Sequence, residues 1–333
     1  MQRLYDDYAD LCTRYPNYIR EITDTSEVTD DNIKTRIGGL CTGDTTMVRA
    51  YEVCELEGHH VTTDATRWSE RKPTFVIVTG IHREWNGVYS MRYTLERIIT
   101  DPALRWLRRN CRFVVLPISN PFSFYGGAAA SGHYNANGVE IHNNFRIDFS
   151  NADDSTHGTA PMTERETWYI DNAIKAYRDD AICLLSCHSF PATSTNFIWG
   201  STATKLMTNT VYRVISMLSY AWMDKYGDAY TTGFDAARKA TSDPTAAGDY
   251  RCGKANISTS SGTEAKAALY HGVQGLNVEV SEGFWIINLD GTNVSLAVSR
   301  GTEAYVNLLS VLAATFNPND RKEYAPTPAY TLE

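Results

Sequence analysis

Four side chains suited to metal chemistry stand at or just after short apolar runs. His82 and Glu84 follow "TFVIVTG", His188 closes "AICLLSCH", and Glu279 lies within "LNVEVS". Two imidazoles and one carboxylate form a zinc ligand set that leaves a fourth position open, and a further glutamate would act as a general base. The convergence of these segments therefore predicts a hydrolytic metal site.

The elements that must position these groups alternate between strands and helices. Short apolar runs, typical of strands buried on both faces, occupy residues 74–80, 113–119, 181–189 and 276–281. Apolar spacing of three to four predicts helices from Val88 to Ile98 and from 163 to 177, the second after a Thr163 and Glu166 capping box, and further helices at 205–224 and 302–316. This order predicts an α/β fold with a single mixed, mostly parallel sheet flanked by helices on both faces. The candidate residues then lie at the carboxyl ends of its strands.

Composition excludes several classes of function. The chain has 333 residues and a formal net charge of -8, which argues against a nucleic-acid partner. A serine-hydrolase GxSxG elbow is absent from the sequence, and its seven cysteines form no disulfide framework or CxxC zinc pattern. The N-terminal stretch lacks the pattern of a signal peptide, and no window is apolar enough for a membrane span, so we expect synthesis in the cytoplasm.

Taken in order, six segments resemble the carboxypeptidase A-like zinc carboxypeptidases. They read "KPTFVIVTGIHREW", "LPISNPFSFYGG", "NANGVEIHNNF", "GTAPMTERETWYI", "LLSCHSF" and "GLNVEVSEG". The resemblance extends over nearly all of the chain up to residue 316. It implies one catalytic domain over residues 1–320, followed by a C-terminal tail at 321–333.

The same resemblance assigns roles to the metal-site residues. It implies a zinc ion held by His82, Glu84 and His188, with Glu279 as the glutamate that activates water. However, the ligand glutamate of the family lies three residues after the first histidine, a position that Trp85 occupies here, whereas Glu84 lies two residues after His82. With this shorter spacing, we expect that only a tight turn would return Glu84 to the metal beside His82. The alternative is a solvated carboxylate at the start of a helix.

The substrate-binding positions depart further from the family. His142 and Asn143 occupy the positions of the asparagine and arginine that grip the terminal carboxylate of a substrate, and His133 lies near the position of the carbonyl-polarising arginine. The family's mobile tyrosine falls near Ile257. Glu264 lies on the specificity loop, where it would favour a basic side chain or simply be a surface charge. Candidates to replace a lost arginine are Arg83 and Arg146.

Two hypotheses of function follow. The first is a zinc-dependent hydrolase that cleaves an amide bond near a carboxyl end, with an atypical peptide or peptidoglycan-like substrate, because asparagine cannot reproduce the charged, bidentate grip of arginine. The second is a catalytically inactive structural or binding module of the same fold, for example a bacteriophage tail component with an assembly partner in the virion. The second hypothesis rests on analogy at the level of the fold.

Overall fold

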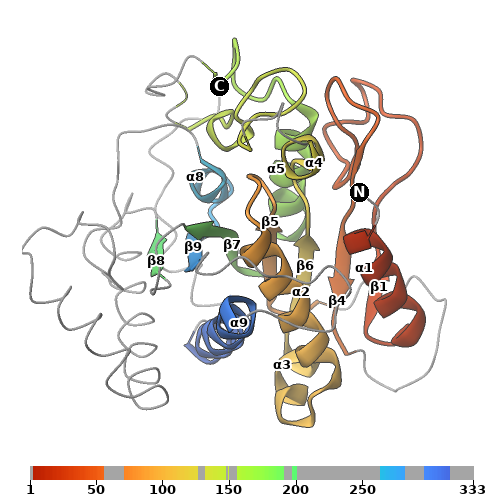
Figure 1. Cartoon of the computed structure of the whole chain (residues 1–333), viewed down its shortest axis with the longest axis vertical. Coiled ribbons are helices and arrows are strands. Elements are labelled where there is room, and N and C mark those ends of the chain that lie inside the picture. The colour runs from red at the N-terminus through yellow and green to blue at the C-terminus, as the bar shows by residue number, and fades with distance from the viewer. Residues whose placement is uncertain are drawn as a thin grey trace, which may run out of the picture.

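A computed structural model of the chain describes residues 3–55, 71–126, 132–147, 149, 156–190, 197–200, 263–281 and 296–315. Its main sheet has seven strands in the order β1-β4-β6-β5-β7-β9-β8 (Figure 1). The strands are β1 (Ile19–Glu21), β4 (Tyr51–Val53), β6 (Arg112–Leu116), β5 (Thr74–Thr79), β7 (Ala181–Phe190), β9 (Gly275–Ser281) and β8 (Phe197–Gly200). The four central strands β6, β5, β7 and β9 are parallel, and the outer pairings are antiparallel. A separate antiparallel pair joins β2 (Gly39–Leu40) to β3 (Met47–Val48).

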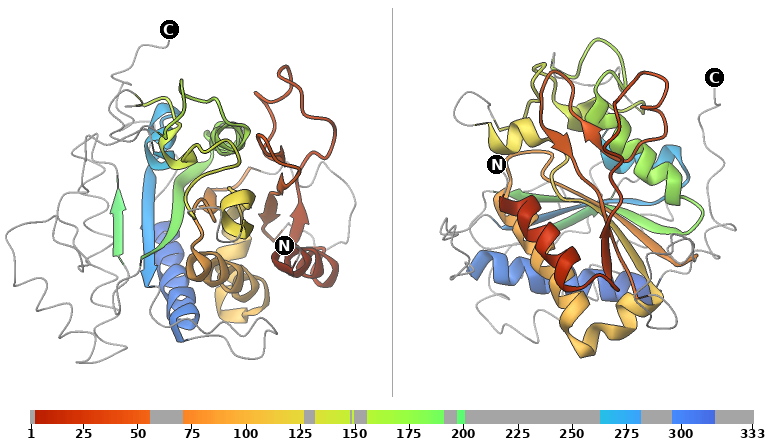
Figure 2. Two further views of the ribbon diagram at one scale, coloured as in Figure 1. Left: turned by 45° about the horizontal axis from the view of Figure 1, so that its top comes forward. Right: turned by 90° about the vertical axis from the view of Figure 1, so that its right-hand side faces the viewer.

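Helices cover both faces of the sheet, as predicted (Figure 2). One face carries α1 (Arg3–Arg14), α2 (Trp85–Thr100), α3 (Arg105–Asn110) and α9 (Leu296–Thr315). The other carries α5 (Arg165–Tyr177) and α8 (Glu264–Tyr270), whereas the short helix α4 (Pro121–Tyr125) packs Phe124 into the core of the first face, against Trp85. Two single turns of 3-10 helix, η2 (Pro102–Leu104) and η3 (Ile141–Asn143), complete the described elements.

Two hydrophobic cores lie on opposite faces of the sheet, and alternate residues of one strand supply both. In β5, Phe75 and Ile77 pack into the core beneath α2 and α9, whereas Val76 and Val78 pack into the core beneath α5. The continuous apolar runs of the sequence therefore reflect burial on both faces, which is characteristic of central parallel strands.

The predicted capping box at the start of α5 is wrong. Glu164 is the N-cap residue and makes no capping hydrogen bond through its side chain. The Thr163 hydroxyl instead accepts a hydrogen bond from Asn144, and the Glu166 carboxylate accepts hydrogen bonds from the backbone and hydroxyl of Thr42. Contacts with residues far away in the sequence have replaced the local cap.

The predictions for the C-terminal half of the chain have mixed outcomes. The helix expected at 302–316 begins earlier, at Leu296. The helix expected at 205–224 and the tail at 321–333 lie outside the described residues. Among the described helices, none combines the length and apolar character needed to cross a bilayer.

Candidate metal centre

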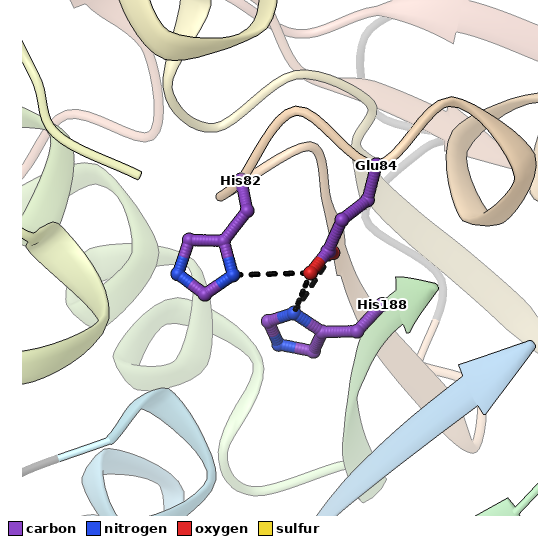
Figure 3. Close-up of side chains that lie close together, drawn as sticks. All are labelled: His82, Glu84 and His188. Carbon is purple, nitrogen blue, oxygen red and sulfur yellow. Dashed lines mark hydrogen bonds and ion pairs between the residues drawn. The ribbon is translucent and has the colours of Figure 1, made fainter. Parts of the chain in front are cut away.

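The predicted ligands His82, Glu84 and His188 meet at the carboxyl ends of β5 and β7. The Glu84 carboxylate lies between the two imidazoles, 3.0 Å from Nδ1 of His82 and 2.9 Å from Nδ1 of His188 (Figure 3). The two imidazole rings are 5.2 Å apart. Segments about 100 residues apart in the chain thus present two nitrogens and a carboxylate to one small volume.

A tight turn brings Glu84 back beside His82. The backbone N–H of Glu84 donates to the carbonyl oxygen of His82 at 2.8 Å, which closes a three-residue turn. Glu84 is the N-cap residue of α2, yet its side chain makes no capping hydrogen bond, because the carboxylate faces the histidines. With a side chain only 12% exposed, Glu84 is not a solvated carboxylate at a helix start.

Gly87 lets the first turn of α2 approach β7 closely. A Cβ atom added at Gly87 would lie 2.9 Å from the carbonyl oxygen of His188, a backbone atom that cannot swing away. The Gly87 N–H also donates to the hydroxyl of Ser189 at 3.2 Å. Nothing in the sequence analysis pointed to this glycine, although it joins the two segments that carry the candidate ligands.

Glu140 supports His82 from the side opposite Glu84, and the sequence analysis missed it. Its carboxylate lies 3.3 Å from Nε2 of His82 and 3.7 Å from Nδ1 of His133. The Asn143 side chain donates to the other Glu140 oxygen at 3.2 Å. Glu140 belongs to the quoted segment "NANGVEIHNNF", so the signal that could have found it was an acidic residue inside a recognised site motif.

Glu264, predicted on a specificity loop, is fully buried against histidines. It begins α8, and its carboxylate lies 3.0 Å from Nε2 of His188 and 2.8 Å from Nδ1 of His142. The Ser186 hydroxyl donates to the same carboxylate. Since the Glu264 side chain has no exposed surface, it is not a surface charge.

Three further predicted residues, His133, Arg146 and Glu279, differ in their surroundings. His133 is half-exposed, with its ring 4.5 Å from that of His82. Arg146 pairs with Asp171 at 3.0 Å and stacks over the rings of Trp168 and Tyr270, so its guanidinium already has a structural role. The backbone of Glu279 lies opposite His188 in the register of β7 and β9, while its side chain, like the whole of Ile257, is outside the described part of the chain.

The charges of the cluster favour a cation at its centre. Burial alone would lower the pKa of His82, but Glu140 and Glu84 outweigh it and raise that pKa to about 9. Burial alone would raise the pKa of Glu84, but His188 and His82 lower it to about 2. The neighbouring histidines likewise outweigh burial and lower the pKa of Glu140 and of Glu264. Ionised, buried carboxylates need positive charge nearby, which protonated imidazoles or a metal ion supply.

The residues present fit a zinc ion. One ligand atom each from His82, Glu84 and His188 lie within 4.8 Å of one another, and two nitrogens with one carboxylate oxygen are a set that zinc prefers. Glu84 Oε2 is buried without a well-aligned hydrogen bond, and so are His82 Nε2, His142 Nδ1 and Glu264 Oε2, so the cluster as a whole offers buried polar atoms to a bound ion. Two adjoining groups, His82 with His133 and Glu140, and His188 with His142 and Glu264, share these histidines.

Comparison with known proteins agrees with the geometry. The sequence model of one family, described as zinc carboxypeptidase, matches residues 42–281. The chain belongs to this zinc carboxypeptidase family. Human carboxypeptidase O is 29% identical over 133 residues, a match that spans 33% of this chain and 36% of that relative. The match therefore extends over little more than a third of the relative's length.

Solved structures of zinc carboxypeptidases share the fold. Carboxypeptidase A from Helicoverpa armigera superposes with a TM-score of 0.61 at 15% identity, covering 94% of this chain and 73% of that one. A metallo-carboxypeptidase from Burkholderia cenocepacia superposes with a TM-score of 0.56 at 13% identity, covering 94% and 68%. At such low sequence identity, these structural similarities establish the fold of the present chain but not its substrate.

Proposed function

We propose that this protein is a zinc-dependent hydrolase that cleaves an amide bond near a carboxyl end. The observation that carries the proposal is the position of Glu84, whose carboxylate lies about 3 Å from Nδ1 of both His82 and His188 although the spacing from His82 is one residue shorter than the family's. The turn at Glu84 compensates for the missing residue, so the ligand set remains complete.

Each residue then has a defined task. His82, Glu84 and His188 would hold the zinc ion, which when bound polarises a carbonyl and lowers the pKa of water. Glu279, opposite His188 on β9, is proposed to take the proton of the attacking water and to pass it to the leaving amine. Glu140 keeps His82 oriented through its Nε2.

We further propose an atypical substrate. An arginine fork would grip a terminal carboxylate with two charged hydrogen bonds, which the amide of Asn143 cannot match. That amide already donates to Glu140, and His142 already contacts Glu264, so both side chains are engaged within the protein. A stem peptide of the peptidoglycan type, or another amide whose terminal carboxylate needs no arginine, suits such a site.

The alternative function, an inactive module such as a bacteriophage tail component, has no specific observation in its favour. Family membership and the ligand geometry both favour the hydrolase. Virion association and synthesis in the cytoplasm stay predictions from the sequence.

Zinc content and hydrolysis together test the proposal. Protein purified without chelator should contain one equivalent of zinc, and the His188→Ala variant should lose it. Paired peptides with free and amidated C-termini should then be cleaved at more similar rates than an arginine clamp would allow. Absence of zinc from both proteins, or zinc without hydrolysis of any amide in the panel, would contradict the proposed activity.

A further inference from the structure

We infer that Glu264 is a positioning residue for the metal site rather than a substrate-specificity residue. Its buried carboxylate holds the proton of His188 on Nε2 and thereby leaves Nδ1 free to bind a metal beside Glu84. The inference deepens the proposed function and rests on His188 being a zinc ligand.

The two nitrogens of His188 face two different carboxylates. Nδ1 lies 2.9 Å from Glu84, and Nε2 lies 3.0 Å from Glu264. A neutral imidazole carries one N–H and one lone pair, so a proton donated to Glu264 from Nε2 leaves the lone pair on Nδ1. The Ser186 hydroxyl, 2.9 Å from the same Nε2, donates its own proton to Glu264 and can therefore only accept there. Glu264 and Ser186 together thus favour a proton on Nε2, which leaves Nδ1 to a metal that Glu84 would also bind.

Neighbouring groups fix the Glu264 carboxylate in place. The Ser186 hydroxyl, two residues before His188 on β7, donates to the Glu264 oxygen that contacts His188. The other oxygen contacts His142, at the 3-10 turn η3. Because the carboxylate contacts two separate segments besides its own helix, it has little freedom to move away from His188.

Close packing of α8 brings Glu264 to this position. A Cβ atom at Gly275, the first residue of β9, would overlap the backbone of Ala265, so the start of α8 lies directly against β9. β9 is in turn the parallel neighbour of β7, with Glu279 opposite His188. The side chain of Glu264 is therefore directed into the sheet edge and has no exposed surface with which to meet a substrate.

His82 shows the same arrangement independently. Its Nδ1 faces Glu84 at 3.0 Å and its Nε2 faces Glu140 at 3.3 Å. Both candidate ligands thus present Nδ1 to Glu84 and have a carboxylate behind Nε2. Carboxylates in this position orient the imidazole and raise its basicity, and their removal typically weakens metal binding about 10- to 100-fold.

Zinc affinity, measured by chelator competition, tests the role of Glu264. The Glu264→Gln variant keeps the shape of the side chain but removes its charge, and its zinc affinity should fall about 10- to 100-fold. Asp171→Asn is the matched control, because Asp171 is equally buried and contacts an imidazole, that of His271, at 2.8 Å. This control should bind zinc as tightly as the wild type.

A second readout requires no variant. In the zinc-loaded wild-type protein, ¹⁵N NMR of the histidine side chains should show His188 protonated on Nε2, and a proton on Nδ1 would overturn the inference. So would an unchanged zinc affinity in Glu264→Gln, or a second zinc equivalent that this variant loses, since Glu264 would then be a direct ligand. A fall in affinity without hydrolysis by the wild type would refute the proposed function and leave the positioning role intact.

Discussion

The two chain segments that carry the candidate ligands are held in very different ways. His188 lies on β7, which pairs with β5 as far as Cys187 and with β9 at His188 itself, and Cys187 packs into the core. His82 and Glu84 lie in a short connection between β5 and α2. Its geometry is set by the turn hydrogen bond, by a hydrogen bond from the Arg83 N–H to the Gly132 carbonyl oxygen, and by the close approach at Gly87. A ligand on a strand is robust to small changes, whereas a ligand in a turn depends on a few contacts.

Among changes in the turn that carries His82 and Glu84, removal of the Glu84 charge should lower zinc affinity most. The Glu84→Gln variant loses the carboxylate that lies between the two imidazoles, so zinc affinity should fall by more than the roughly 100-fold that marks the upper range for supporting residues. Chelator competition beside Glu264→Gln gives the ranking. A smaller loss for Glu84→Gln than for Glu264→Gln would show that the turn does not deliver a ligand.

Gly87→Ala should disturb the contact between the two segments. The added methyl group would lie 2.9 Å from the His188 carbonyl oxygen, and such overpacking typically costs about 1 to 3 kcal/mol. The free energy of unfolding from urea titration should fall by this amount, and zinc affinity should fall with it because α2 and β7 are pushed apart. Wild-type stability in the variant would mean that the segments are less tightly joined than the structure shows.

Glu166 offers an electrostatic contrast with Glu84. Both carboxylates are buried, but Glu166 contacts Thr42 and Asn135 instead of histidines. Burial outweighs the hydrogen bonds from Thr42 and raises the pKa of Glu166 to about 7, whereas histidines lower that of Glu84. The presence or absence of a cationic partner therefore decides whether the pKa of a buried carboxylate falls or rises.

The sign of the resulting pH dependence follows from the raised pKa. The unfolded chain releases the Glu166 proton above about pH 4.5, whereas the folded protein retains it until about pH 7. The free energy of unfolding should therefore lose on the order of 3 kcal/mol from this group as pH rises through that window. Glu166→Gln should flatten this part of the profile in urea titrations at pH 5 and pH 8, and an unchanged slope would contradict the shift.

Sequence patterns predicted the regular elements better than the contacts between them. The apolar runs located all four central strands, because burial on both faces leaves a signature in every residue. His188 could be placed for the same reason. The position of Glu84 required a turn, and a turn of three residues has no periodic pattern to reveal it.

Long-range contacts were the least predictable part of the site. Thr163 and Glu166 matched a local capping pattern, but Asn144 and Thr42 are their actual partners. Glu264 matched a family position for substrate recognition, yet its carboxylate lies against His188, 76 residues earlier in the chain. Such partners are chosen by packing, so only the folded structure identifies them.

Anomalous diffraction at the zinc absorption edge, from crystals grown with zinc, tests the central claim most directly. We expect a peak bonded to Nδ1 of His82, Nδ1 of His188 and the Glu84 carboxylate, at the roughly 2.0 to 2.2 Å typical of zinc. No peak at this position, or a peak bonded to either histidine through Nε2, would contradict the account.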